Sequence, residues 1–135
     1  MISEDAARKS RIVLGVDDQA ENIMLLEALL ETAGYSFMSA SSGPECLSLA
    51  LRCTPRLILL DVQMPEMDGY ETCRRLRAIW LLRQVPIAFL TARKAADDVK
   101  VGLAAGGNDF IVKPFDHEKL LARVDYWTKR TVAAA

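Results

Sequence analysis

The chain has 135 residues, of which 51% are hydrophobic and 26% charged, and its net charge of −1 argues against a surface that binds nucleic acid directly. This length suits one domain with a buried core, and no apolar run approaches the roughly 20 residues needed for membrane insertion. The first residues include acids where a signal peptide would be basic and then apolar, so we expect a single cytoplasmic domain.

The first half of the chain alternates between short apolar runs, which predict strands, and segments whose apolar residues recur at helical spacing. A first helix follows the first strand and ends at Gly34. A second helix begins at Gly43-Pro44 and ends before Thr54-Pro55. The expected strands cover residues 11–16, 35–40 and 57–60.

The second half continues this alternation after a loop rich in Met, Pro, Asp and Gly. Apolar residues at helical spacing then mark a third helix. They are Tyr70, Cys73, Leu76 and Trp80. A fourth helix ends at Gly106, and a fifth begins after the capping residue Asp116, with Trp127 rather than Tyr126 facing the core. The fourth helix is expected to cover residues 95–105, and the two strands on either side of it are expected to cover residues 87–90 and 110–112.

Strict alternation predicts parallel strands, right-handed crossovers and helices on both faces of the sheet. Residues 35–40 mix polar and apolar side chains, as an edge strand can. The predicted fold is therefore α/β, a three-layer doubly wound (βα)5 sandwich of the flavodoxin-like kind, with a parallel five-stranded sheet in the order 2-1-3-4-5. The domain is expected to cover residues 11–130, between a flexible N-terminal segment, 1–10, and a flexible tail, 131–135.

Polar residues end four of the predicted strands, at the edge where this fold forms its ligand crevice. Asp17 and Asp18 follow the first strand, Asp61 the third, Thr91 the fourth and Lys113 the fifth. Converging carboxylates repel one another unless a divalent cation compensates, and oxygen ligands favour Mg2+ or Mn2+. The set contains no histidine or cysteine, which argues against zinc.

A carboxylate beside a cation, a lysine and a hydroxyl is the set that phosphoryl transfer requires, because the transferred group carries negative charge on three oxygens. Mg2+ would cover one oxygen, Lys113 could pair with a second and Thr91 could donate to a third, which leaves Asp61 as the nucleophile. Each residue alone also has a structural explanation as a loop cap, helix cap or solvated lysine. The combination favours phosphoryl transfer.

Four segments give the sequence a family resemblance. They are Val16-Asp17-Asp18, the run from Leu60 to Gly69, Leu90-Thr91-Ala92, and the run from Asn108 to Phe115. Through them the chain resembles a response-regulator receiver domain of two-component signal transduction, in the CheY-like superfamily, over about residues 11–130. It departs from the usual pattern at Gln19 and Gly107, and neither departure removes a ligand.

The resemblance implies a set of roles for the residues around the crevice. Asp61 would be phosphorylated. Asp18, Asp61 and the backbone carbonyl of Gln63 would bind Mg2+ directly, and Asp17 would act through a bound water. The backbone amides expected to contact the phosphoryl oxygens are those of Met64 and Ala92.

The resemblance also implies a switch and an unusual peptide bond. Thr91 and Phe110 would form the switch pair, in which Thr91 moves toward the phosphoryl group and Phe110 fills the space left behind. The alternative for Phe110 is a plain core residue, although the family more often carries a partly exposed aromatic there. A cis peptide bond is expected between Lys113 and Pro114.

Gln63 and Arg93 each lie two residues past a site residue, where they could flank the attacking water and change the lifetime of the acyl phosphate, or could simply be exposed loop residues. The readout surface would comprise the fourth helix, fifth strand and fifth helix. Lys100, Lys119 and Arg123 there could bind a protein target or a second copy, or could be solvated. The expected phosphoryl donor is a histidine kinase or a histidine phosphotransfer protein.

Three classes of protein are candidates for this sequence. The favoured one is a receiver that is not an enzyme beyond its own phosphoryl transfer and autodephosphorylation, and that acts as a stand-alone regulator. A haloacid-dehalogenase-like phosphatase needs a second aspartate where Gln63 stands. A flavodoxin-like cofactor binder would have a Ser/Thr/Gly-rich phosphate loop, whereas Asp17 and Asp18 would repel a phosphate. A pseudo-receiver that only binds proteins is the remaining alternative.

Overall fold

The computed structural model describes residue 8 and residues 11–92 and 95–129. The strands are β1 (Ile12–Val16), β2 (Ser36–Ala40), β3 (Leu57–Asp61), β4 (Ile87–Thr91) and β5 (Asp109–Val112). The helices are α2 (Ala20–Thr32), α3 (Gly43–Cys53), α4 (Gly69–Ala78), the 3-10 helix η1 (Trp80–Leu82), α5 (Ala96–Ala105) and α6 (His117–Lys129). The predicted flexible ends lie outside the described residues, except for Arg8.

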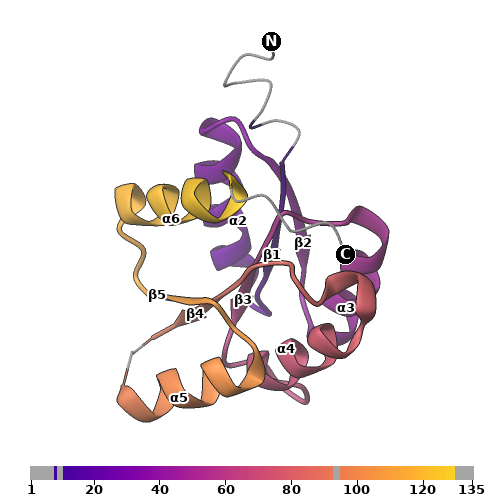
Figure 1. The fold of residues 1–135 in the computed structure, drawn as a ribbon. Coiled ribbons are helices and arrows are strands. Elements are labelled where there is room, and N and C mark those ends of the chain that lie inside the picture. Colours follow the sequence, from indigo (N-terminus) through magenta and orange to yellow (C-terminus); the bar gives the residue numbers. More distant parts are fainter. Residues whose placement is uncertain (1–7, 9–10, 93–94, 130–135) are drawn as a thin grey trace.

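The strands pair in parallel to form one sheet in the order β2-β1-β3-β4-β5, with β2 at an edge as its composition predicted. Helices α2 and α6 pack on one face of the sheet, and α3, α4 and α5 pack on the other (Figure 1). The predicted doubly wound α/β sandwich is confirmed. Because all strands run the same way, their carboxyl ends meet along one edge, and this edge positions the candidate site.

The central strands supply apolar side chains to both layers of the core. Leu57 and Leu59 of β3 face the layer of α2 and α6, whereas Ile58 and Leu60 face α3, α4 and α5. All four are at most 1% exposed, and each such burial contributes about 1.5–3 kcal/mol. Over the described part of the chain, no helix combines the length and the apolar character that a membrane span requires.

The predicted third helix is wrong at its C-terminal end. Helix α4 ends at Ala78, and Ile79 has an extended backbone with φ −88° and ψ 118°. Trp80, which was predicted to belong to the third helix, lies in η1 and is 64% exposed, whereas Leu82 is 1% exposed. The guanidinium of Arg83 lies 3.4 Å from the centre of the Trp80 ring, a cation–π contact. The turn at Ile79 therefore gives the core position to Leu82 and leaves the indole outside.

Arg77 of α4 joins segments that are distant in the sequence. Its guanidinium donates to the carbonyl oxygens of Leu82 at 3.1 Å, Val85 at 2.6 Å and Gly106 at 2.8 Å, and to Oδ1 of Asn108 at 2.9 Å. Burial lowers the pKa of Arg77. The planar group thus satisfies acceptors beside η1, α5 and the loop before β5 at once.

We expect Arg77→Ala to lower the free energy of unfolding by about 2–4 kcal/mol, because it leaves carbonyl groups without donors and opens a cavity. Urea unfolding followed by circular dichroism measures this loss. Arg74→Ala is the matched control on the same helix, since Arg74 is half exposed in a surface pair with Glu71 and should cost about 0.5 kcal/mol or less. Equal losses in the two variants would contradict the structural role of Arg77.

Candidate functional site

Strands β1 and β3 bring three carboxylates together at the carboxyl edge of the sheet. Asp17, Asp18 and Asp61 each offer an oxygen within 4.8 Å of the others, which confirms the predicted convergence. Asp17 and Asp61 are 0% and 5% exposed, whereas Asp18 is exposed. A set of oxygen donors that is only partly open to solvent suits a hard divalent cation such as Mg2+.

Lys113 connects two of these acids. Its Nζ donates to Oδ2 of Asp17 and to Oδ1 of Asp61, each at 3.0 Å. Burial alone would lower the pKa of Lys113, but its hydrogen bonds with Asp61 and Asp17 outweigh burial and raise the pKa, so the ammonium stays charged at neutral pH. The peptide bond between Lys113 and Pro114 is cis, as the resemblance led us to expect.

Asp61 lies where a negative charge is poorly compensated. Burial raises its pKa, the hydrogen bond from Lys113 opposes this rise, and repulsion from Asp17 and Asp18 adds to it. One lysine therefore does not balance the three acids. A divalent cation among the carboxylates would favour their charged forms.

Asp17 is held by further donors of the chain. The backbone amide of Gln19 donates to Oδ1 of Asp17 at 2.9 Å, and the side-chain amide of Asn22 donates to Oδ2 at 3.0 Å. Asn22 lies in the first turn of α2 and is half-buried. Asn22 was not predicted from the sequence, although a polar side chain in the first helical turn after two aspartates is a signal for such a contact.

The loop after Asp61 folds back onto the strand end. The backbone amide of Gly69 donates to the carbonyl of Val62 at 2.8 Å, and a Cβ at Gly69 would lie 2.3 Å from the carbonyl oxygen of Asp61. Only glycine permits this approach. Asp68 then caps α4 by accepting from the amide of Glu71 at 2.8 Å. The loop is thereby fixed against the backbone of Asp61.

A small cavity of about 80 Å³ opens beside Asp61. The residues that line it are Gln19, Asp61, Val62, Gln63, Leu90, Thr91, Ala92 and Lys113. Thr91 is 8% exposed, so its side chain lies mostly inside the protein. Met64 is buried but is not among the lining residues, and Arg93 lies outside the described residues. The structure therefore brings together most of the predicted residues.

Phe110 is buried in the core of the domain. Phe110 is 5% exposed and packs on Phe89, with ring centres 5.3 Å apart. A Cβ at Gly102 of α5 would lie 2.3 Å from Cζ of Phe110. The missing side chain at Gly102 therefore gives the ring its place in the core. Thr91 and Phe110 lie on the paired strands β4 and β5.

The surface formed by α5, β5 and α6 corresponds to the predicted readout surface. Val101, Leu103, Val112 and Tyr126 are 42–55% exposed on these three elements. A cavity of about 340 Å³ lies between β5 and α6 on this surface. The cations predicted for this surface, Lys100, Lys119 and Arg123, are all exposed. This surface combines apolar and basic groups.

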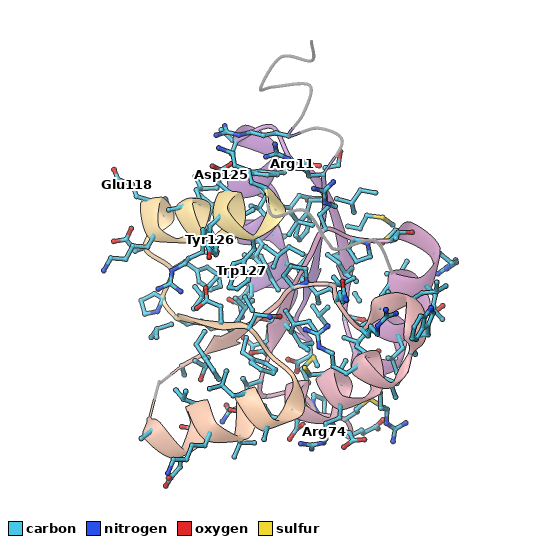
Figure 2. All side chains as sticks on the ribbon, in the orientation of Figure 1. Arg11, Arg74, Glu118, Asp125, Tyr126 and Trp127 are labelled. Carbon is cyan, nitrogen blue, oxygen red and sulfur yellow. The ribbon has the colours of Figure 1, made fainter. Side chains whose placement is uncertain are left out.

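Asp109, at the start of β5, attaches α6 to the sheet. It accepts hydrogen bonds from Nε1 of Trp127 at 2.9 Å, from Arg123 and from the amide of Phe110. Trp127 is half-buried and Tyr126 exposed, which confirms the predicted orientation of α6 (Figure 2). Burial alone would raise the pKa of Asp109, but these hydrogen bonds outweigh it and lower the pKa.

The lowered pKa of Asp109 predicts a pH-dependent contribution to stability. As the pH falls, the Asp109 carboxyl of the unfolded chain, with an ordinary pKa of 3.8, binds a proton before the carboxyl of the folded chain does. The stabilisation that Asp109 gives the folded state is therefore complete above this pKa. It is lost as the pH falls through the lower pKa of the folded state. We expect Asp109→Asn to be less stable than wild type at neutral pH and the difference to narrow in this acid range, measured by thermal unfolding. Glu118→Gln is the control, because Glu118 is an exposed acid of α6, the helix that Asp109 attaches to the sheet. A constant difference at all pH values would contradict the prediction.

Comparison with known proteins identifies one family. The model of the response regulator receiver domain matches residues 13–125. The response regulator PleD of Caulobacter vibrioides is 42% identical over 117 residues, which are 87% of this chain and 26% of PleD. The alkaline phosphatase synthesis transcriptional regulatory protein PhoP of Bacillus subtilis is 40% identical over 123 residues, 91% of this chain and 50% of PhoP. The chain thus spans between a quarter and a half of the length of these relatives.

Solved structures give the same result. The chemotaxis protein CheY4 of Vibrio cholerae has a TM-score of 0.83 and 32% identity, covering 86% of this chain and 97% of its own. The receiver domain of the sensor histidine kinase PA1611 of Pseudomonas aeruginosa, solved with a magnesium ion coordinated in its active site cleft, has a TM-score of 0.82 and 33% identity, covering 89% and 98%. The chain belongs to the response regulator receiver domain family of two-component signal transduction.

Proposed function

We propose that Asp61 accepts a phosphoryl group from a histidine kinase or a histidine phosphotransfer protein in a Mg2+-dependent reaction. The observation that carries this proposal is the position of Lys113, 3.0 Å from both Asp17 and Asp61, beside a cavity that Thr91 also lines. The domain then acts in the cytoplasm as a phosphorylated signalling module and not as an enzyme for a separate substrate.

The acidic cluster suits a hard divalent cation because its donors are oxygens only. Asp18, Asp61 and the backbone carbonyl of Gln63 would hold Mg2+, with Asp17 acting through a bound water. Mn2+ prefers the same donors. When bound, the ion would neutralise carboxylate charge and the charge of one phosphoryl oxygen.

The chemistry of the transfer follows from the groups around Asp61. A carboxylate oxygen of Asp61 forms a bond to phosphorus as the P–N bond of a phosphohistidine breaks, and the imidazole nitrogen leaves with the electron pair. Lys113 passes from the carboxylates to a phosphoryl oxygen and keeps its charge. Thr91 donates to another oxygen, and the backbone amides of Met64 and Ala92 supply further donors.

Phosphorylation is proposed to act on the surface of α5, β5 and α6. Thr91 moves toward the phosphoryl group, and Phe110 lies buried on the neighbouring strand. The phosphate then stabilises the state in which Thr91 contacts it and the Phe110 ring is buried, relative to a state in which the ring is exposed. The exposed apolar and basic groups of the surface then bind a downstream protein target or a second copy. Gln63, exposed at the cavity, would flank the water that removes the phosphate. The same role is proposed for Arg93 from its place in the sequence, two residues after Thr91.

Acetyl phosphate with Mg2+ tests the proposal directly. Intact-mass measurement of the wild type should show one phosphate adduct that requires Mg2+. Beryllofluoride, which mimics the phosphoryl group, should change the tryptophan fluorescence or the NMR spectrum of the backbone amides, and this change should also require Mg2+. A wild type that gives neither response would instead indicate a pseudo-receiver, the alternative in which the domain only binds proteins.

A further inference from the structure

Asn22 contacts the candidate metal site without belonging to it. Its Nδ2 lies 3.0 Å from Oδ2 of Asp17, the same oxygen that accepts from Lys113 at 3.0 Å. The other oxygen of Asp17 accepts from the backbone amide of Gln19 at 2.9 Å. Asp17 itself is 0% exposed, so these protein donors largely decide how its carboxylate is oriented.

We propose that Asn22 is a positioning residue that keeps the Asp17 carboxylate oriented for a divalent cation when Lys113 turns to the phosphoryl group. This inference rests on the proposed function of Asp61. Of the two side-chain donors to Oδ2, Lys113 also contacts Asp61 and is the one that the phosphoryl group would draw away. Asn22 would then be the remaining side-chain donor that these contacts provide to Oδ2.

The chemistry of an amide suits this role. Asn22 is neutral, so it orients the carboxylate without competing with a cation for the negative charge, as a second lysine or an arginine would. The second lone pair of Oδ2 is free to accept from a metal-bound water once Lys113 leaves. Groups of this kind, one step outside the ligands, typically change metal affinity 10- to 100-fold when they are removed.

The local helix fixes where the amide can reach. Asn22 lies two residues after Ala20, the first residue of α2, and its backbone amide donates to the carbonyl of Gln19 at 3.1 Å. Gln19 occupies the N-cap position but makes no side-chain cap. The described hydrogen bond of the Asn22 side chain goes to Asp17 and not to a backbone group at the start of the helix.

The test titrates the purified domain with Mg2+ alone by calorimetry and with Mn2+ by electron paramagnetic resonance. We expect Asn22→Ala to weaken the apparent Kd about tenfold, and Asn22→Gln, which keeps the donor, to recover part of the loss. In phosphorylation by phosphoramidate, Asn22→Ala should need correspondingly more Mg2+ for half-maximal rate while its rate at saturating Mg2+ stays close to that of wild type. Glu21→Ala is the matched control, an exposed residue of the same helical turn.

The outcomes separate this inference from the proposed function. If wild type binds Mg2+ and takes up phosphate but Asn22→Ala binds Mg2+ within about twofold of wild type, the role of Asn22 is refuted. It is also refuted if Glu21→Ala weakens binding as much as Asn22→Ala, because the effect would then come from the helix. A wild type that neither binds Mg2+ nor takes up phosphate refutes the proposed function, and the inference with it.

Discussion

Asp61→Asn should give no covalent phosphate adduct with acetyl phosphate and Mg2+ under conditions in which the wild type is phosphorylated. The change replaces one oxygen by an NH2 group of nearly the same size, so the buried position beside Lys113 is kept while the nucleophilic carboxylate is lost. Intact mass and acid-labile phosphate measure the result. The expected effect is complete loss, because no other described carboxylate combines burial, Lys113 and the cavity in this way.

The control for Asp61→Asn is a conservative change at an acid away from the site. Asp97→Asn alters an exposed acid of α5 and should leave the adduct unchanged. Circular dichroism should show that both variants fold. An adduct on Asp61→Asn equal to that on wild type would refute the assignment of the phosphoacceptor.

Lys113→Ala should slow phosphorylation by acetyl phosphate about 10²- to 10³-fold at saturating Mg2+, the usual loss when one preorganised donor to a developing charge is removed. Lys113 is the cation nearest to Asp61 among the described contacts, at 3.0 Å, and its side chain is 22% exposed. Its loss also leaves Asp17 and Asp61 to repel each other in a mostly buried site.

A time course of intact mass measures this rate. Lys113→Arg should recover little activity, because a planar guanidinium cannot take the place of a compact ammonium that reaches two acids on different strands. Lys119→Ala removes an exposed lysine of α6 and should phosphorylate at the wild-type rate. A rate for Lys113→Ala within about threefold of wild type would overturn the role of Lys113.

The positions of the site residues could be predicted because they follow from topology. Asp61 and Thr91 end buried strands, and the alternation of strands and helices fixes the order of those strands in the sheet. The carboxyl ends of parallel strands lie at one edge of the sheet, so the residues that end them lie close together independently of the loop conformations. Lys113 is brought there by the same rule, directly after β5.

Other features of the structure could not be predicted, because they depend on tertiary packing that the local sequence pattern does not encode. Trp80 continues the helical period of its stripe, but the backbone leaves the helix at Ile79 and Leu82 fills the core instead. Phe110 is admitted to the core by an absent side chain on α5, Gly102, which lies eight residues away in sequence on another element. The contact of Asn22 with Asp17 depends on how α2 is oriented relative to the end of β1, which the sequence pattern does not give.

The shared position of Lys113 also sets a thermodynamic relation between two ligands. In the unphosphorylated domain the ammonium already neutralises part of the acidic cluster, so an arriving cation competes with it. A phosphoryl group on Asp61 that draws Lys113 away removes this competitor. By linkage, the phosphorylated form then binds the cation more tightly than the free form, and the cation stabilises the phosphorylated form by the same factor. On the proposed function of Asp61, the concentration of free divalent ion would therefore shift the equilibrium between the unphosphorylated and phosphorylated forms.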